Sequence, residues 1–356
     1  MNPFYNYSGH HSMEGLGLIQ GNVKGIIQHN LLSISDLGIP LGLIGQEYWS
    51  RKSTQPYEGK ESQKWEKGLK TVNKELGDIG KKIVLIQDRE ADIFSFFQAP
   101  RAKNVDLLVR VHQPRNMELL HSQKVCKLAD MSDELPVLGK KTVTISRNGK
   151  EITLTLSLQG GGVNVLSGKK GSKEQKTQGL SLVIAQEIEA VDANGKNVFD
   201  PNEKAIWYLL TSLKVENESD MQEITGFYAL RWQVERLHYT LKSGALNVEK
   251  LQFDDLQTTI NALSFYSVVA WQLLAIVYLT RHQKDEIAST CFEENEIIIL
   301  EKTNQKTLKT VKEVTLALVK LAGFAPSKKQ PMPGIKILAQ ALERFYYIKL
   351  GFHAKP

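Results

Sequence analysis

The chain has 356 residues, with 45 Lys and Arg against 39 Asp and Glu, so its formal net charge is +6. A hydrophobic content of 42% with 24% charged residues is ordinary for globular proteins and excludes wholesale disorder. Cys126 and Cys291 are the only cysteines and lie far apart in the chain, which excludes a disulfide scaffold or a cysteine-based zinc site.

The first third of the chain predicts alternating strands and helices. Residues 24–35 and 39–49 are expected to form strands paired as a β-hairpin across the turn at 36–38. Apolar residues at helical spacing predict a surface helix over 61–76, and the short apolar run at 82–87 is typical of a buried strand. Asp92 is expected to cap a helix over 93–97, and residues 105–111 predict a further strand.

After Pro114 the pattern changes to alternating β segments. Two strictly alternating runs, 141–146 and 151–157, flank an Asn-Gly pair that is typical of a tight hairpin turn. Strands are also expected at 180–188 and 205–212, and from Asp220 to the end the pattern is mostly helical. The fold class is therefore α/β, with a mixed sheet interrupted by an antiparallel β insertion and followed by a helical C-terminal region.

Residues 256–280 contain no charged side chain and are long enough to cross a bilayer. Polar side chains are scattered through this stretch, and no other segment resembles a second span. We therefore favour a helix buried in a large domain over a membrane helix, and expect no membrane partner.

A charged hexapeptide, Gln-Asp-Arg-Glu-Ala-Asp at 87–92, follows the predicted strand at 82–87. A carboxylate at the carboxyl end of a buried strand lies at the edge of an open α/β sheet where ligands bind. Asp88 is thus a candidate functional acid. The alternative is a charged turn that only joins a strand to a helix.

A second candidate site lies on the predicted helix over 227–242. At about 100° per residue, Tyr228, Arg231, Glu235 and Lys242 fall within an arc of about 60°, opposite an apolar face. One carboxylate flanked by two cations and a phenol would suit metal and phosphate binding. The alternative is a solvated face with weak salt bridges.

These residues resemble a known family. The spacing Tyr228-x2-Arg231-x3-Glu235-x6-Lys242 is similar to the tyrosine-arginine-glutamate-lysine signature of bacterial DDE transposases of the insertion-sequence-four family. The segment from Asp88 to Asp92 resembles the second-aspartate motif of that family, and the β block between the two motifs resembles its insertion. The match runs from about Tyr7 to Lys250 in the same segment order.

The resemblance implies an RNase H-like core that cleaves and transfers DNA strands at transposon ends with two Mg²⁺ ions, Mn²⁺ being a possible substitute. Asp88 and Glu235 would be the second and third catalytic carboxylates and metal ligands. Tyr228, Arg231 and Lys242 would hold phosphates of the DNA end, and Arg89 is expected to contact DNA.

The resemblance also implies roles for a tryptophan and for partners. Trp207 matches a residue that stacks a flipped base during hairpin formation, although a tryptophan in a strand is by default a core residue. The implied partners are double-stranded DNA, as element ends and target, and a second copy of the chain in a homodimer. The implied location is the bacterial cytoplasm, with the nucleoid.

One family residue has no match. The first catalytic aspartate is expected just before the segment that resembles Phe4–His10, and Met1-Asn2-Pro3 stand there instead. Glu14 and Asp36 are no obvious substitutes. The expectation is an N-terminally truncated transposase with little or no cleavage activity of its own. A DNA-binding or dimerising fragment that inhibits the full enzyme, a stand-alone nuclease and a decayed gene remain as alternatives.

The expected domain ranges follow from this reading. Residues 1–113 would form the first part of the core, with its first strand largely missing, and 114–214 the β-rich insertion. Residues 215–250 would complete the core with the helix of Glu235, and 251–356 would form the helical region.

Overall fold

A computed structural model describes residues 3–10, 12–51, 61–147, 150–167, 175–177, 179–328 and 330–353. The chain divides into two compact units. Unit 1 comprises Met1–Glu58 and Gln233–Pro356, and unit 2 comprises Gly59–Trp232. The expected domain ranges divide the chain differently and stay a prediction.

Unit 1 contains a four-stranded antiparallel sheet centred on its longest strand, β3. The hairpin expected near the N-terminus is confirmed, because β3 pairs with β4 from Ile27↔Trp49 to Ile34↔Pro40. Two short strands that the sequence pattern did not predict pair with the first half of β3. The strands are β1 (Phe4–Asn6), β2 (Gly17–Gln20), β3 (Val23–Ile34) and β4 (Pro40–Trp49).

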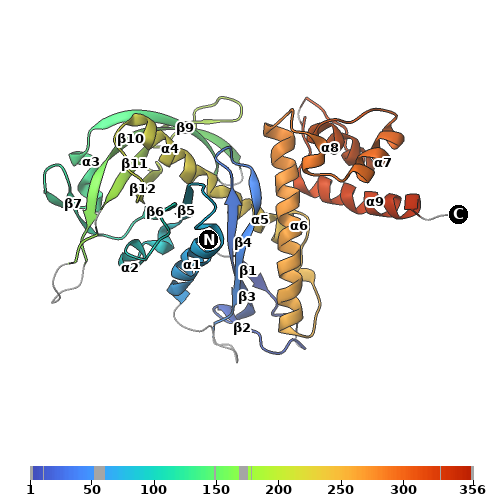
Figure 1. The fold of residues 1–356 in the computed structure, drawn as a ribbon, viewed down its shortest axis with the longest axis horizontal. Helices are drawn as coiled ribbons and strands as arrows, with labels where there is room; N and C mark the ends of the chain where they lie inside the picture. The colour runs from blue at the N-terminus through green and yellow to red at the C-terminus, as the bar shows by residue number, and fades with distance from the viewer. Residues whose placement is uncertain are drawn as a thin grey trace. The chain divides into compact units, whose positions relative to one another are not determined.

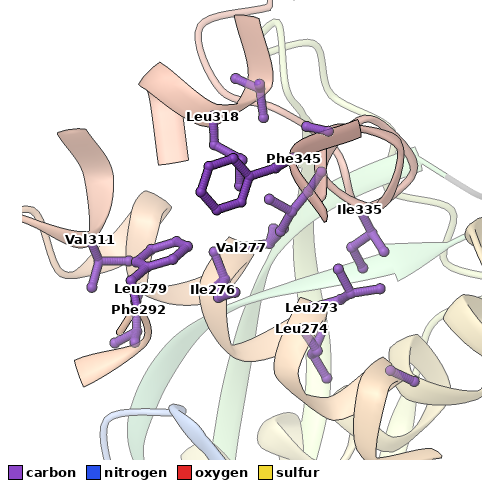
Figure 2. Packing of buried hydrophobic residues seen from close by; sticks show 14 of the residues in the cluster. Leu273, Leu274, Ile276, Val277, Leu279, Phe292, Val311, Leu318, Ile335 and Phe345 are labelled. Atoms are coloured by element: carbon purple, nitrogen blue, oxygen red, sulfur yellow. The ribbon is translucent and has the colours of Figure 1, made fainter. Parts of the chain in front are cut away.

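Four α-helices follow in the later part of unit 1, where the sequence pattern predicted mostly helix. The long helix α6 packs against β4, α8 and α9. Figure 2 shows buried side chains of α6, α8 and α9 meeting in one apolar cluster, with Phe345 reaching toward Leu318. The helices are α6 (Leu256–His282), α7 (Glu294–Asn304), α8 (Val311–Val319) and α9 (Ile335–His353).

Local side-chain caps explain where these helices begin. The Asp255 carboxylate accepts the N–H of Thr258 at 2.6 Å, which starts α6. Thr310 and Glu313 form a reciprocal capping box at the start of α8. Such caps satisfy amide groups that have no partner within the first turn of a helix.

Among the described residues, α6 is the one helix long and apolar enough to cross a membrane. Half of its most apolar window is buried inside the protein. Leu263, Leu273 and Leu274 are among its side chains that form the core of unit 1. A core helix passes the same length and composition test, so one such helix is weak evidence for a membrane span.

Unit 2 is built on an eight-stranded mixed sheet in the order β5-β6-β12-β11-β10-β7-β8, with β9 paired to β10. β5 and β6 run parallel and the remaining pairs are antiparallel. The strands are β5 (Ile83–Gln87), β6 (Val105–Val111), β7 (Asn116–Leu119), β8 (Val125–Lys127), β9 (Val137–Arg147), β10 (Lys150–Val165), β11 (Leu180–Asp192) and β12 (Ile206–Thr211).

The helices of unit 2 flank this sheet (Figure 1). Helix α4 lies against β9–β12 and buries Met221, Ile224 and Tyr228 in a second apolar cluster. It begins at a capping box formed by Asn217 and Asp220. The helices are α1 (Lys64–Leu76), α2 (Phe94–Phe97), α3 (Met131–Glu134) and α4 (Glu218–Leu230).

The α/β class with a mixed sheet is confirmed, while the RNase H-like detail stays a prediction. The predicted strands at 82–87, 105–111, 180–188 and 205–212 correspond to β5, β6, β11 and β12. The alternating runs form the β9–β10 hairpin, although its Asn-Gly turn at 148–149 lies outside the described residues. The strands of unit 1 form a sheet separate from that of unit 2.

The prediction of one regular helix over 227–242 is wrong. Helix α4 ends at Leu230, and α5 spans Trp232–Tyr239. A π-helical turn then spans Thr240–Gly244. The amides of Ala245 and Leu246 both bond to the carbonyl of Thr240, at 3.3 and 3.2 Å, so the turn is wider than an α-helical one. The even spacing of about 100° per residue therefore does not extend to Lys242.

Candidate functional site

Asp88 follows directly after β5, at the carboxyl end of the parallel pair β5–β6. Its Oδ1 accepts the N–H of Glu90 at 3.0 Å, and the carbonyl of Asp88 accepts the N–H of Ala91 at 3.1 Å. These bonds form a single 3₁₀ turn over Arg89–Ala91. Asp88 is half-buried and Arg89 is exposed, so the turn gives solvent access to a carboxylate beside a guanidinium.

Glu90, the next residue in this turn, is tied to helix α1. The Lys64 ammonium lies 3.0 Å from the Glu90 carboxylate, and the Lys64 side chain is only 4% exposed. Its Nζ also lies 4.7 Å from the centroid of the Trp65 ring. A buried ammonium requires such compensation, so this contact fixes Glu90 against the start of α1.

Asp92 does not cap a helix, and that prediction is wrong. Helix α2 begins at Phe94, and Ile93 precedes it without a side-chain cap. The Asp92 side chain is fully buried and points instead to the segment after β6. Its Oδ2 accepts the N–H groups of His112 and Gln113, both at 2.8 Å, and its Oδ1 accepts Nε of Arg115 at 2.6 Å.

Trp207 and Tyr228 form an aromatic pair inside unit 2. Their ring centroids lie 5.2 Å apart in an edge-to-face arrangement, and the residues are 7% and 4% exposed. The Arg231 guanidinium lies 5.7 Å from the centroid of the Tyr228 ring. The described conformation thus buries both rings in the core, and their predicted contacts with DNA would require β12 or α4 to move.

Glu235 is half-buried in the first turn of α5. The same helix is attached to the sheet of unit 1 through His238, which is buried. The His238 Nε2 lies 3.3 Å from the Asn30 amide nitrogen, and the Gln46 amide donates to Asn30 Oδ1 at 3.2 Å. These polar contacts with β3 and β4 fix the rotation of the helix that carries Glu235.

Lys242 contacts the chain near the N-terminus. Its ammonium donates to the carbonyl of Phe4 at 2.7 Å and lies 3.3 Å from the Glu249 carboxylate. Glu249 also accepts the N–H of Asn6 at 2.7 Å. Burial, aided by the Glu249 charge, raises the pKa of the Tyr7 phenol, which donates to the carbonyl of Val248. Lys242 is one-third exposed, so part of it remains accessible to a phosphate.

The two candidate metal ligands belong to different units: Asp88 to unit 2 and Glu235 to unit 1. Over the residues that the structure describes, neither unit gathers three or more His, Cys, Asp or Glu side chains into a metal-binding cluster. Each candidate nevertheless supplies a half-buried carboxylate, the donor that Mg²⁺ and Mn²⁺ prefer. The donor chemistry therefore fits the expected ions.

The sequence reasoning singled out Asp88, Arg89 and Glu235 but missed the anchoring contacts of Glu90 and Asp92. The available signal was the density of acids in the hexapeptide at 87–92. It could not show which acids are bound by cations, because Lys64 lies 26 positions and Arg115 23 positions away from their partners.

Comparison with solved structures finds a likeness to a piggyBac transposase in a synaptic complex with hairpin DNA. The sequence identity is 8% and the TM-score is 0.40. The alignment covers all of this chain and 53% of that one, so the chain spans about half the length of that transposase.

Comparison with protein families finds the transposase DDE domain over residues 60–270, a range that contains both Asp88 and Glu235. The matched range is more than half of the 356 residues. This chain therefore belongs to the family of transposases defined by the DDE domain.

Proposed function

We propose that this chain acts on double-stranded DNA at the ends of a bacterial insertion sequence of the insertion-sequence-four family, in a cut-and-paste reaction. The observation that carries the proposal is the family match over 60–270, which includes both candidate carboxylates and the basic residues around them. DDE transposase domains generally depend on divalent metal ions. Asp88 and Glu235 are the residues that would hold Mg²⁺ or Mn²⁺, which when bound would stabilise charge on phosphodiester oxygens and acidify a water molecule.

The protein's own groups would bind and orient the DNA. Arg89 is exposed beside Asp88, and Arg231 and Lys242 provide further cations near the two motifs. A guanidinium can contact two phosphate oxygens at once, which positions a strand end. Tyr228 and Trp207 would join these contacts only in a conformation that opens their buried aromatic pair.

DNA binding is tested by fluorescence anisotropy with a labelled random-sequence duplex at several salt concentrations. The logarithm of the binding constant falls linearly with the logarithm of the salt concentration, and each phosphate contact adds about 0.9 to the steepness of this slope. Arg89→Gln and Lys242→Gln should each reduce this slope by about 1. Lys196→Gln, an exposed lysine in the turn after β11, is the matched control. An affinity that does not change with ionic strength would overturn the DNA-binding proposal.

Metal binding is tested separately by titrating Mn²⁺ and following water proton relaxation. Asp88→Asn and Glu235→Gln should each weaken Mn²⁺ binding, whereas Glu189→Gln, at an exposed acid of β11, should not. DNA binding should survive Glu235→Gln. If Mn²⁺ binds both variants as tightly as it binds the unmodified chain, these two acids do not share an ion.

The 356 residues contain matches for the second and third carboxylates of the family and none for the first. The alternative proposal is that a polypeptide of these residues is a DNA-binding or dimerising fragment that does not nick DNA and that inhibits a complete transposase. Efficient nicking of end-containing DNA in Mg²⁺ or Mn²⁺ would overturn this.

Sedimentation with and without DNA tests the proposed homodimer, and fractionation of bacterial cells tests the proposed cytoplasmic, nucleoid-associated location.

A further inference from the structure

The charged turn at 87–92 contains four ionisable side chains, and cations from other elements bind Glu90 and Asp92. Asp92 is fully buried and Glu90 keeps half of its side chain exposed, while Asp88 is half-buried and Arg89 is exposed. Glu90 is bound by Lys64 at the start of α1, and Asp92 by Arg115 beyond the end of β6. The turn is therefore held on both sides.

Several hydrogen bonds fix the Asp92 side chain at the end of this turn. Its carboxylate is fully buried and accepts three hydrogen bonds, two from backbone N–H groups and one from Arg115. Arg115 also donates to the carbonyl of Asp92 and lies over the Phe97 ring, 5.9 Å from its centroid. Both oxygens of the carboxylate accept hydrogen bonds, so the site requires a side chain with an acceptor on each side.

The anchor lies four residues after Asp88, and the intervening chain is a single hydrogen-bonded turn. The N–H of Asp92 itself bonds to the carbonyl of Arg89 at 3.3 Å. Any displacement of Asp92 is thus transmitted to the backbone of Arg89 and, through the bonds of Glu90 and Ala91, to Asp88. Fixing Asp92 against β6 fixes the direction in which Asp88 and Arg89 leave the sheet.

We propose that Asp92, with Arg115, is a positioning residue that holds Asp88 and Arg89 in the orientation needed to contact DNA. The proposal rests on the proposed function for the role of Arg89, and on geometry alone for the order of the turn. Glu90 and Lys64 provide the second anchor of the same turn.

The test uses Asp92→Asn in the full chain. An asparagine places an NH₂ group against either the two backbone N–H groups or Arg115, so at least one donor loses its acceptor. The matched control is Glu187→Gln in β11. The Glu187 side chain is also fully buried, pairs with Arg147 at 3.2 and 2.5 Å, and accepts the N–H of Ala205 at 2.7 Å. Both variants therefore disturb a buried carboxylate–arginine pair of unit 2.

The first measurement is amide hydrogen exchange of the peptide covering 87–92, which needs no DNA. Asp92→Asn should accelerate its exchange about tenfold or more, since charged hydrogen bonds of this kind are lost, while Glu187→Gln should not. Arg115→Lys, which keeps the charge but loses the geometry of Nε, is the second variant if Asp92→Asn fails to fold. Unchanged exchange in both variants would overturn the proposal.

The second measurement is the salt dependence of duplex binding, which a purely structural role would not change. Asp92→Asn should reduce the slope by about 1, as Arg89→Gln does, and the double variant should show no further reduction. Glu187→Gln should keep the full slope. Additive losses in the double variant would mean that Asp92 does not act through Arg89. If the unmodified chain fails to bind duplex, the proposed function fails, and the exchange measurement still decides whether Asp92 orders the turn.

Discussion

Replacing Trp207 with alanine distinguishes a core tryptophan from one that is available to stack on a base. Trp207 lies on β12 between β6 and β11 and is 7% exposed. Its ring meets the edge of Tyr228 on α4, with 5.2 Å between centroids. The substitution removes an indole from the apolar cluster that joins α4 to the sheet.

The expected loss of stability follows from this burial. Large-to-small substitution of a buried aromatic residue lowers the free energy of unfolding by about 3–5 kcal/mol. About 0.5–1.5 kcal/mol of that belongs to the edge-to-face pair with Tyr228. Domains are typically stable by about 5–15 kcal/mol, so the loss is a large fraction of the total. The melting temperature of unit 2 should fall by about 6–20 °C, at about 2–4 °C per kcal/mol for a domain of this size.

Thermal unfolding followed by circular dichroism measures the shift, and hydrogen exchange of β11 and β12 assigns it to unit 2. Trp207→Phe keeps an aromatic ring and should lower the free energy of unfolding by less than Trp207→Ala does. Trp232→Ala is the matched control, because Trp232 is 37% exposed and is the last residue of unit 2. Its substitution should lower stability less than Trp207→Ala does, because more of its side chain is already exposed.

A double-mutant cycle with Tyr228→Leu isolates the pair itself and should give a coupling of about 0.5–1.5 kcal/mol. The reasoning would be refuted if Trp207→Ala unfolded at the temperature of the unmodified chain. Unchanged stability together with weaker binding of hairpin DNA would show that the indole serves the DNA and not the core.

Three further predictions concern other parts of the molecule. Phe345 is 3% exposed in the core shared by α8 and α9, so Phe345→Ala should lower the free energy of unfolding of unit 1 by about 3–5 kcal/mol. Hydrogen exchange in α8 and α9 should accelerate, and acceleration confined to β10 and β11 would contradict this. Burial raises the pKa of the Cys291 thiol to about 11, so iodoacetamide should label Cys291 slowly at pH 8 and faster as the pH approaches 11; rapid labelling at pH 8 would show an accessible thiolate. The N–H of Thr258 lowers the pKa of Asp255 below its usual 3.8. Because the pKa of Asp255 is lower in the folded than in the unfolded chain, its stabilisation of α6 is complete above about pH 4 and is lost as the pH falls further. Acid unfolding of Asp255→Ala should lack this pH-dependent loss of stability. Acid unfolding identical to that of the unmodified chain would contradict the cap.

The sequence alone determined the local elements and the family motifs. The strand at 82–87 and the helix at 61–76 follow from apolar periodicity, which depends only on neighbouring residues. The hairpin over 24–49 follows from two β-rich runs around a short turn. Asp88 and Glu235 were found because each stands in a compact motif with a recognisable spacing, and both fall within the matched DDE domain.

Only the tertiary structure decided what the individual side chains of these motifs contact. Asp92 looked like a helix cap, and it is a buried anchor because Arg115 and the amides after β6 reach it from the next strand. The helix over 227–242 looked regular, and it is interrupted at Arg231 and widened after Thr240. Trp207 is buried because α4 packs against the sheet of unit 2. Partners separated by tens of residues leave no periodic signal in the sequence, so such contacts become visible only once the chain is folded.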